Sequence, residues 1–150
     1  MKSSASASAV PKMAENIALY SVCYVAKLES QVILDGPMRE TLDRMLDSMT
    51  SEHMGFSNFL SSLNLNKDNC CVSLCNIFAE MLSDQRLNWG RVLTIYCFSG
   101  CTAKHLIEKG CSSDVAIQIA RTCGDFVTKE MSIWIEEQGG WVSHNHLHST

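Results

Sequence analysis

An arginine stands at the start of the most apolar part of this chain. Arg91 follows Gly90 directly and leads into an apolar segment that begins at Val92. Its guanidinium is always charged and presents a planar fork of N–H donors that matches a carboxylate, so a charge placed beside apolar surface needs an acidic partner. These residues predict a carboxylate-binding site, and the acid comes either from a binding partner or from this chain, from Asp84 or Glu80.

Eight cysteines and five histidines are the other residues that could do chemistry. Cys97, Cys101 and His105 share one helical face and could hold a metal ion, but no fourth ligand is evident, so packed thiols beside a surface histidine are favoured. A cysteine-dependent enzyme is an alternative. The cysteines lie in apolar stripes without a nearby base or a Gly-rich turn, which argues against it. We expect reduced thiols, no metal and no cofactor.

The composition predicts one compact domain in a soluble chain. The chain has 150 residues, 46% of them hydrophobic, and a net charge of −4. No basic stripe that could bind nucleic acid is present. No run of eighteen or more apolar residues occurs and no signal segment opens the chain, so a cytosolic protein without its own membrane anchor is expected.

The elements that must position Arg91 are predicted to be helices. Residues 1–13 are rich in serine and alanine and are expected to be disordered, which leaves one domain over 14–150. A largely apolar helix is predicted for 15–34, and Gly36-Pro37 ends it and starts the next. Three further segments repeat apolar residues at one-turn spacing: Leu42, Met45, Leu46 and Met49; Phe56, Phe59, Leu60 and Leu63; and Leu74, Ile77, Phe78, Met81 and Leu82.

The segment that begins at Arg91 is predicted to be the central helix. Asn88 can cap it, and apolar residues occur nearly all round its wheel. After Gly110, Ser112 or Ser113 can cap another helix, and Gly139-Gly140 is expected to divide two short terminal helices. The pattern predicts an all-α bundle of about seven or eight helices around a buried central one.

Two short motifs resemble the signatures of one protein family. The first is Asn88-Trp89-Gly90-Arg91, and the second begins at Trp134, ends at Trp141 and contains Gly139-Gly140. In this order, with helical periodicity between them, they resemble the first and second homology boxes of the Bcl-2 family of apoptosis regulators. The resemblance implies a Bcl-2-like bundle with a hydrophobic groove on its surface.

The resemblance also implies which residues form this groove. In the family the groove binds an amphipathic death-motif helix, whose aspartate would meet Arg91. Asn88 would offer its amide to the polar face of that helix, and Gly90 would allow its backbone to approach. The implied lining comprises Phe56, Phe59, Ile77, Met81, Thr94 and Phe98, with Met49 and His53 at the groove wall. Each of these also fits a plain core stripe. The implied structural residues are Trp89, Trp134, Gly139, Gly140 and Trp141.

The segment 42–47 resembles the third homology motif of the family. Leu46 stands where that motif has a glycine or another small residue, and its bulk would hinder this helix from docking as a ligand into another groove. A receptor is therefore favoured over a death agonist. The segment 84–88 lacks a glycine that the family has before the first box, and Ser99 replaces the first of two closing glycines. These departures leave the ligand range of the groove open.

The resemblance implies an inhibitor of apoptosis. It would sequester death-motif helices of pro-apoptotic proteins (Bim-like, Bid-like, Puma-like and Bak/Bax-like) and so prevent mitochondrial permeabilisation. The short connection around Gly36 and the absence of an anchoring tail before Thr150 look most like a compact virus-encoded member; either this form works without an anchor or its tail has been removed. A pore-forming pro-apoptotic relative is the alternative within the family. The protein would be cytoplasmic, would reach the mitochondrial surface through its partners, and could form a homodimer over its apolar groove.

Overall fold

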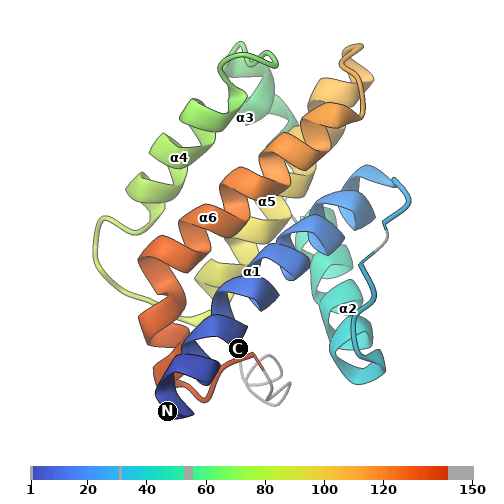
Figure 1. The fold of residues 1–150 in the computed structure, drawn as a ribbon. Helices are drawn as coiled ribbons and strands as arrows, with labels where there is room; N and C mark the ends of the chain where they lie inside the picture. Colours follow the sequence, from blue (N-terminus) through green and yellow to red (C-terminus); the bar gives the residue numbers. More distant parts are fainter. Residues whose placement is uncertain (1, 31, 53–55, 142–150) are drawn as a thin grey trace.

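The computed structural model describes residues 2–30, 32–52 and 56–141, and every regular element among them is an α-helix (Figure 1). This confirms the all-α prediction. The described helices are α1 (Lys2–Ala26), α2 (Gly36–Glu52), α3 (Phe56–Ser62), α4 (Cys70–Met81), α5 (Trp89–Glu108) and α6 (Asp114–Glu137). None of them is both long enough and apolar enough to cross a membrane.

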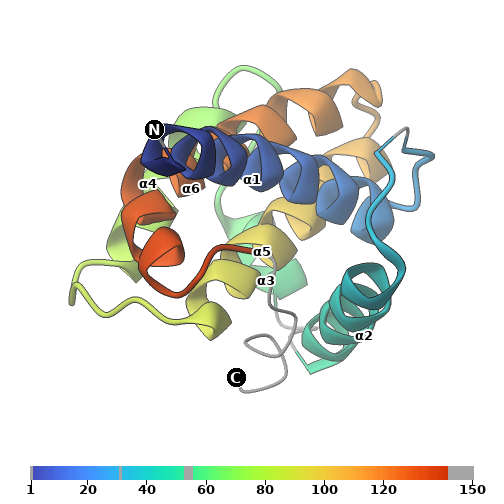
Figure 2. The same ribbon diagram turned by 60° about the horizontal axis from the view of Figure 1, so that its bottom comes forward.

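Helix α5 forms the centre of the core, as its all-round apolar pattern predicts. Val92, Ile95 and Tyr96 on it have no exposed surface. Helices α1 and α6 pack on α5 and on each other, α2 and α3 pack on α5, and α4 packs on α6 and α5. Figure 2 shows the same arrangement from another side, with α2 and α4 on opposite sides of α5 in both views.

Helix α1 is held against α5 by close contacts. The Tyr96 hydroxyl donates a hydrogen bond of 3.1 Å to the carbonyl of Ala14 inside the core. At Gly100 the two helices approach so closely that a Cβ would lie 2.6 Å from the Cβ of Val25. Only glycine permits this approach, so the position of α1 along α5 depends on Gly100.

The bounds of α1 differ from the prediction at both ends. The helix ends at Ala26 rather than near Leu34, because Lys27 takes a left-handed conformation (φ 61°) and the N–H of Leu28 donates to the carbonyl of Cys23 at 2.8 Å. It begins at Lys2, so it includes residues that the Ser/Ala-rich composition predicts to be disordered. Alanine favours helix, and composition alone does not weigh that tendency. A domain boundary near residue 14 stays a prediction.

The C-terminal part of the chain corrects the predicted number of helices. Seven or eight were expected, whereas the described residues form six, because one helix of 24 residues, α6, replaces the shorter ones expected there. Its buried residues recur every fourth position without interruption from Val115 to Ile135. Gly139 and Gly140 have positive φ, and the N–H of Gly140 donates to the carbonyl of Ile135 at 2.9 Å. The two glycines therefore end α6, and residues 142–150 lie outside the described part.

Candidate functional site

The first turn of α5 places Arg91. Asn88 is the N-cap, with an extended backbone, and its side chain accepts a hydrogen bond of 2.9 Å from the N–H of Arg91. This confirms the predicted cap, which satisfies one of the free N–H groups at the helix start. At Gly90 a Cβ would meet only the Asn88 side chain, at 3.2 Å. A side chain at position 90 would therefore crowd only the cap.

The guanidinium of Arg91 is paired with Asp84. Its Nη1 and Nη2 donate to the two carboxylate oxygens of Asp84 at 2.6 and 2.8 Å, and Nη1 also donates to the carbonyl of Met81 at 2.6 Å. Of the two internal acids that the sequence offers, Asp84 is therefore the partner of the guanidinium. The pair lies at the surface, with side chains 28% and 47% exposed.

The pairing with Asp84 leaves one edge of the guanidinium open. Arginine has five N–H donors, and Met81 and Asp84 take both of those on Nη1 and one of those on Nη2. The Nε–H and the second N–H of Nη2 find no acceptor among the described residues. These two donors point in parallel from the same edge, so they can bind a second carboxylate in a bidentate way.

An aromatic cluster lies further along α5. Phe56 and Phe59 of α3 pack on Phe98 of α5, with ring centroids 5.0 and 6.0 Å apart and the first pair edge to face. Phe98 is buried, whereas Phe59 is 45% exposed. The structure thus brings together three of the residues expected in the groove, and one of them presents an aromatic ring to solvent.

The remaining predicted lining residues occupy three helices. Ile77 and Met81 on α4 and Thr94 on α5 are half-buried, and the carbonyl of Met81 binds Arg91. Met49 is half-buried on α2, which lies on the other side of α5 from α4, so the structure does not bring it next to Ile77 or Met81. His53 lies outside the described residues. The ligand contacts of all these residues stay predictions.

Three tryptophans close the end of the bundle at Asn88. Trp89 is buried, and its ring lies 5.1 Å from that of Trp134 and 5.2 Å from that of Trp141. Trp141 also packs on Tyr96 at 6.0 Å. The two sequence motifs therefore meet in space. This arrangement fits the structural part expected for these tryptophans, because it braces the start of α5 from which Arg91 projects.

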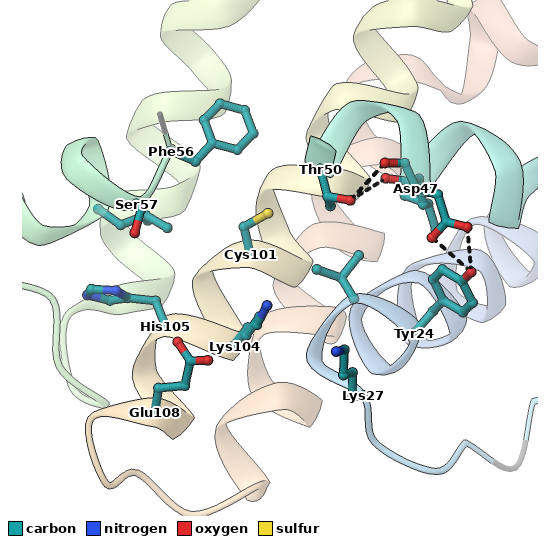
Figure 3. A pocket seen from close by; sticks show the side chains of 13 residues that line it. Tyr24, Lys27, Asp47, Thr50, Phe56, Ser57, Cys101, Lys104, His105 and Glu108 are labelled. Atoms are coloured by element: carbon teal, nitrogen blue, oxygen red, sulfur yellow. Dashed lines mark hydrogen bonds between the residues drawn. The ribbon is translucent and has the colours of Figure 1, made fainter. Parts of the chain in front are cut away.

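A cavity of about 680 Å³ lies at the opposite end of α5 (Figure 3). Residues of α2, α3, α5 and the end of α1 line it, among them Lys27, Leu46, Phe56, Cys101 and Lys104. Phe56 is the one lining residue of this cavity that the sequence motifs predict for the groove. The cavity and the open edge of Arg91 are thus separate features. Phe56 lines the cavity and also packs on Phe98, which is one of the residues predicted for the groove.

Cys101 is a residue whose setting the sequence reasoning missed. Figure 3 shows its thiol between Phe56 and Lys104 in the cavity. A hydrogen bond from the Cys97 thiol, together with the charge of Lys104, lowers the pKa of Cys101, whereas burial raises the pKa of Cys123 to about 12. The spacing of Cys97, Cys101 and Lys104 on one helix could have indicated this. Within the described residues, no three metal-binding side chains gather in a suitable group.

Comparisons with known proteins find partial matches to regulators of apoptosis. It is 34% identical over 68 residues to "Anti-apoptotic protein NR13" of Gallus gallus, covering 45% of this chain and 38% of that protein. It is also 34% identical over 68 residues to "Apoptosis regulator BAX" of Mus musculus, covering 43% and 33%. Well under two-thirds of either relative is therefore matched.

The fold has a close counterpart among solved structures. In the crystal structure of the zebrafish pro-survival protein NRZ with a Bad BH3 segment, the protein superposes with a TM-score of 0.78. The identity is 22%, and the superposition covers 91% of this chain and 93% of that one. At this identity the likeness shows a shared fold. The family profile described as apoptosis regulator proteins, Bcl-2 family, matches residues 39–141, which include both motifs, and the chain belongs to the Bcl-2 family.

Proposed function

We propose that this chain is a pro-survival member of the family, which binds the death-motif helix of a pro-apoptotic protein. The observation that carries the proposal is the open edge of Arg91. A fixed cation with two parallel, unused N–H donors stands at the start of the buried central helix, in the position of the first homology box. Such an edge suits an aspartate on a docking helix.

The apolar part of the ligand would lie along α5. Phe59 is exposed beside Phe98, and Ile77 and Met81 on α4 keep part of their surface accessible. These residues would bind the apolar anchors of an amphipathic helix, while Arg91 fixes its register. Burial of the anchors supplies most of the affinity, and the ion pair supplies orientation and selectivity.

Leu46 supports a receptor rather than a ligand. To act as a death agonist, α2 would have to leave the bundle and present its apolar face to another groove. Leu46 and Leu42 are buried in the core with 0% and 2% of their surface exposed, so release of α2 would expose both. The likeness to NR13, named as anti-apoptotic, and to the pro-survival protein NRZ also supports this choice.

By capturing Bim-like, Bid-like, Puma-like or Bak/Bax-like helices, the protein would prevent mitochondrial permeabilisation by mass action. It would act in the cytoplasm and at the mitochondrial surface. The virus-encoded origin and the homodimer stay predictions. Family members are described as regulators, and no covalent step is needed for capture.

The alternative within the family is a pore-forming executioner. The identity to "Apoptosis regulator BAX" of the mouse is 34% over the matched segment, the same as that to NR13, so identity alone does not choose the role. Expression of the chain in cells given a death stimulus separates the two functions. Higher survival than in cells with an empty vector supports the proposal. Lower survival, or death without the stimulus, contradicts it and favours the executioner.

The proposed site is tested by calorimetric titration of a Bim-like death-motif peptide into wild-type protein and Arg91→Ala. We expect the substitution to weaken binding by roughly tenfold or more, which corresponds to about 1.4 kcal/mol, because the partly exposed pair is worth less than a fully desolvated one. Arg121→Ala, which removes an exposed arginine from α6, is the matched control. Equal affinity for wild type and Arg91→Ala would remove Arg91 from the mechanism.

A further inference from the structure

We propose that Asp84 sets how much a ligand's acidic residue contributes to binding, by sharing the guanidinium of Arg91 with it. This inference rests on the proposed function and deepens it. Asp84 holds the end of the guanidinium through Nη1 and Nη2, and the ligand carboxylate takes the open edge through Nε and Nη2. In the complex, one positive charge would serve two carboxylates.

Hydrogen bonds from the backbone and from Arg91 hold the Asp84 carboxylate in place. One of its carboxylate oxygens also accepts a hydrogen bond of 3.1 Å from the N–H of Arg86, within the turn that leads to α5. Gln85 in this turn has a positive φ of 61°, and its N–H donates to the carbonyl of Leu82 at 2.9 Å. Asp84 is thus fixed by the backbone on one side and by Arg91 on the other.

The charge state of Asp84 is compatible with this arrangement. The hydrogen bonds from Arg91, and after them the N–H of Arg86, hold the pKa of this carboxyl below its usual range. A carboxyl with a lowered pKa is ionised at neutral pH. It therefore presents a negative charge next to the open edge of the guanidinium.

Asp84 would therefore reduce the binding free energy that the ligand's carboxylate contributes. A second carboxylate that approaches the same guanidinium gains the attraction of Arg91 and meets the repulsion of Asp84. Because both groups lie at the surface, the repulsion is screened and modest. The protein would then select ligands more by their apolar anchors and less by their aspartate than a receptor with an unshared arginine would.

The test is a double-mutant cycle between Asp84→Asn and a Bim-like peptide whose conserved aspartate is replaced by asparagine. Asparagine keeps the carbonyl oxygen that accepts from Arg86 and removes the charge. We expect Asp84→Asn to tighten binding of the acidic peptide by roughly threefold to tenfold and to leave binding of the amide peptide unchanged. Asp125→Asn, which removes the same charge from the exposed face of α6, should change neither affinity.

The other outcomes overturn the inference in distinguishable ways. Unchanged or weaker binding of the acidic peptide to Asp84→Asn would show that Asp84 does not oppose the ligand's acid, and the proposed function would stand. Equal tightening of both peptides would show a general charge effect and would also reject the sharing of Arg91. If neither peptide bound wild type or either variant, the proposed function would fail and the inference with it.

Discussion

The two ends of α5 differ in what they offer to a binding partner. At its start, Asn88 caps the helix, three tryptophans pack beneath it, and Arg91 keeps a fixed edge with two unused donors. At its other end, α5 borders an open volume of about 680 Å³ that contains lysines and a thiol. The hydrogen bonds at the first end converge on Arg91, whereas those at the second join Tyr24 to Asp47 and Thr50 to Leu46 along the cavity wall.

The proposed docking of a death-motif helix depends on the first of these ends and not on the cavity. A helix that docks on the surface needs a register-setting charge and exposed apolar side chains rather than an enclosed cavity. In the proposed function, Arg91 would supply this charge and the ring of Phe59 would supply an apolar contact. The cavity is lined instead by Lys104 and by Cys101, whose pKa is lowered by the hydrogen bond from Cys97 and the charge of Lys104.

The largest expected effect concerns the contact that fixes the cavity end of α5 against α1. Gly100→Ala would place a Cβ 2.6 Å from Val25, and we expect a loss of about 1–3 kcal/mol in the free energy of unfolding from overpacking. Urea unfolding measures it. Gly36→Ala, where a Cβ meets nothing within 4 Å, is the control. An equal change in both variants would show that the approach of α1 to α5 is not tight.

A smaller effect is expected at the start of α5. Asn88→Ala removes the side chain that accepts from the N–H of Arg91 and should lower the free energy of unfolding by about 1 kcal/mol. Ser113→Ala at the start of α6 is a matched control, because the Ser113 side chain makes no capping hydrogen bond. Thermal unfolding of both variants gives the comparison. A similar loss in Ser113→Ala would contradict the importance of the Asn88 cap.

The smallest effect is expected at the cavity, where the reactivity of a thiol rather than the stability of the fold is measured. Cys101 should be alkylated by iodoacetamide faster than Cys123, because the pKa of Cys101 is lowered whereas burial raises that of Cys123 to about 12. Its reaction should begin to accelerate at a lower pH, where the thiolate first forms. Mass spectrometry of the modified peptides over a pH series measures this, with Cys101→Ser identifying the signal. Equal rates at both cysteines would contradict the described setting.

The sequence predicts the framework of the first end of α5 well. The cap at Asn88 and the buried central helix follow from local patterns, since a capping residue and an all-round apolar wheel depend on few neighbours. It also offers Asp84 as one of two possible partners of Arg91. The choice between Asp84 and Glu80 depends on the left-handed turn at Gln85, which no local preference predicts.

The other end of α5 and the chain ends are less predictable. The cavity depends on how α1, α2 and α3 pack around α5, and the spacing of apolar residues on single helices does not contain that information. Residues 114–137 form one helix where a longer and a short one were expected, whereas Gly139 and Gly140 do interrupt the chain, and a helix expected after them lies outside the described residues. Likewise, the left-handed residue that ends α1 is a lysine, which carries no turn signal.

The most direct test of the central claim is an NMR titration of the isotope-labelled protein with a Bim-like death-motif peptide. If the ligand docks at the Arg91 end, the backbone signals of Asn88, Arg91 and Thr94 and those of Ile77 and Met81 on α4 should shift most. The side-chain signal of the Arg91 Nε–H should move as it gains its acceptor. Shifts confined to Lys27, Lys104 and His105 around the cavity, with no change at Arg91, would contradict the account.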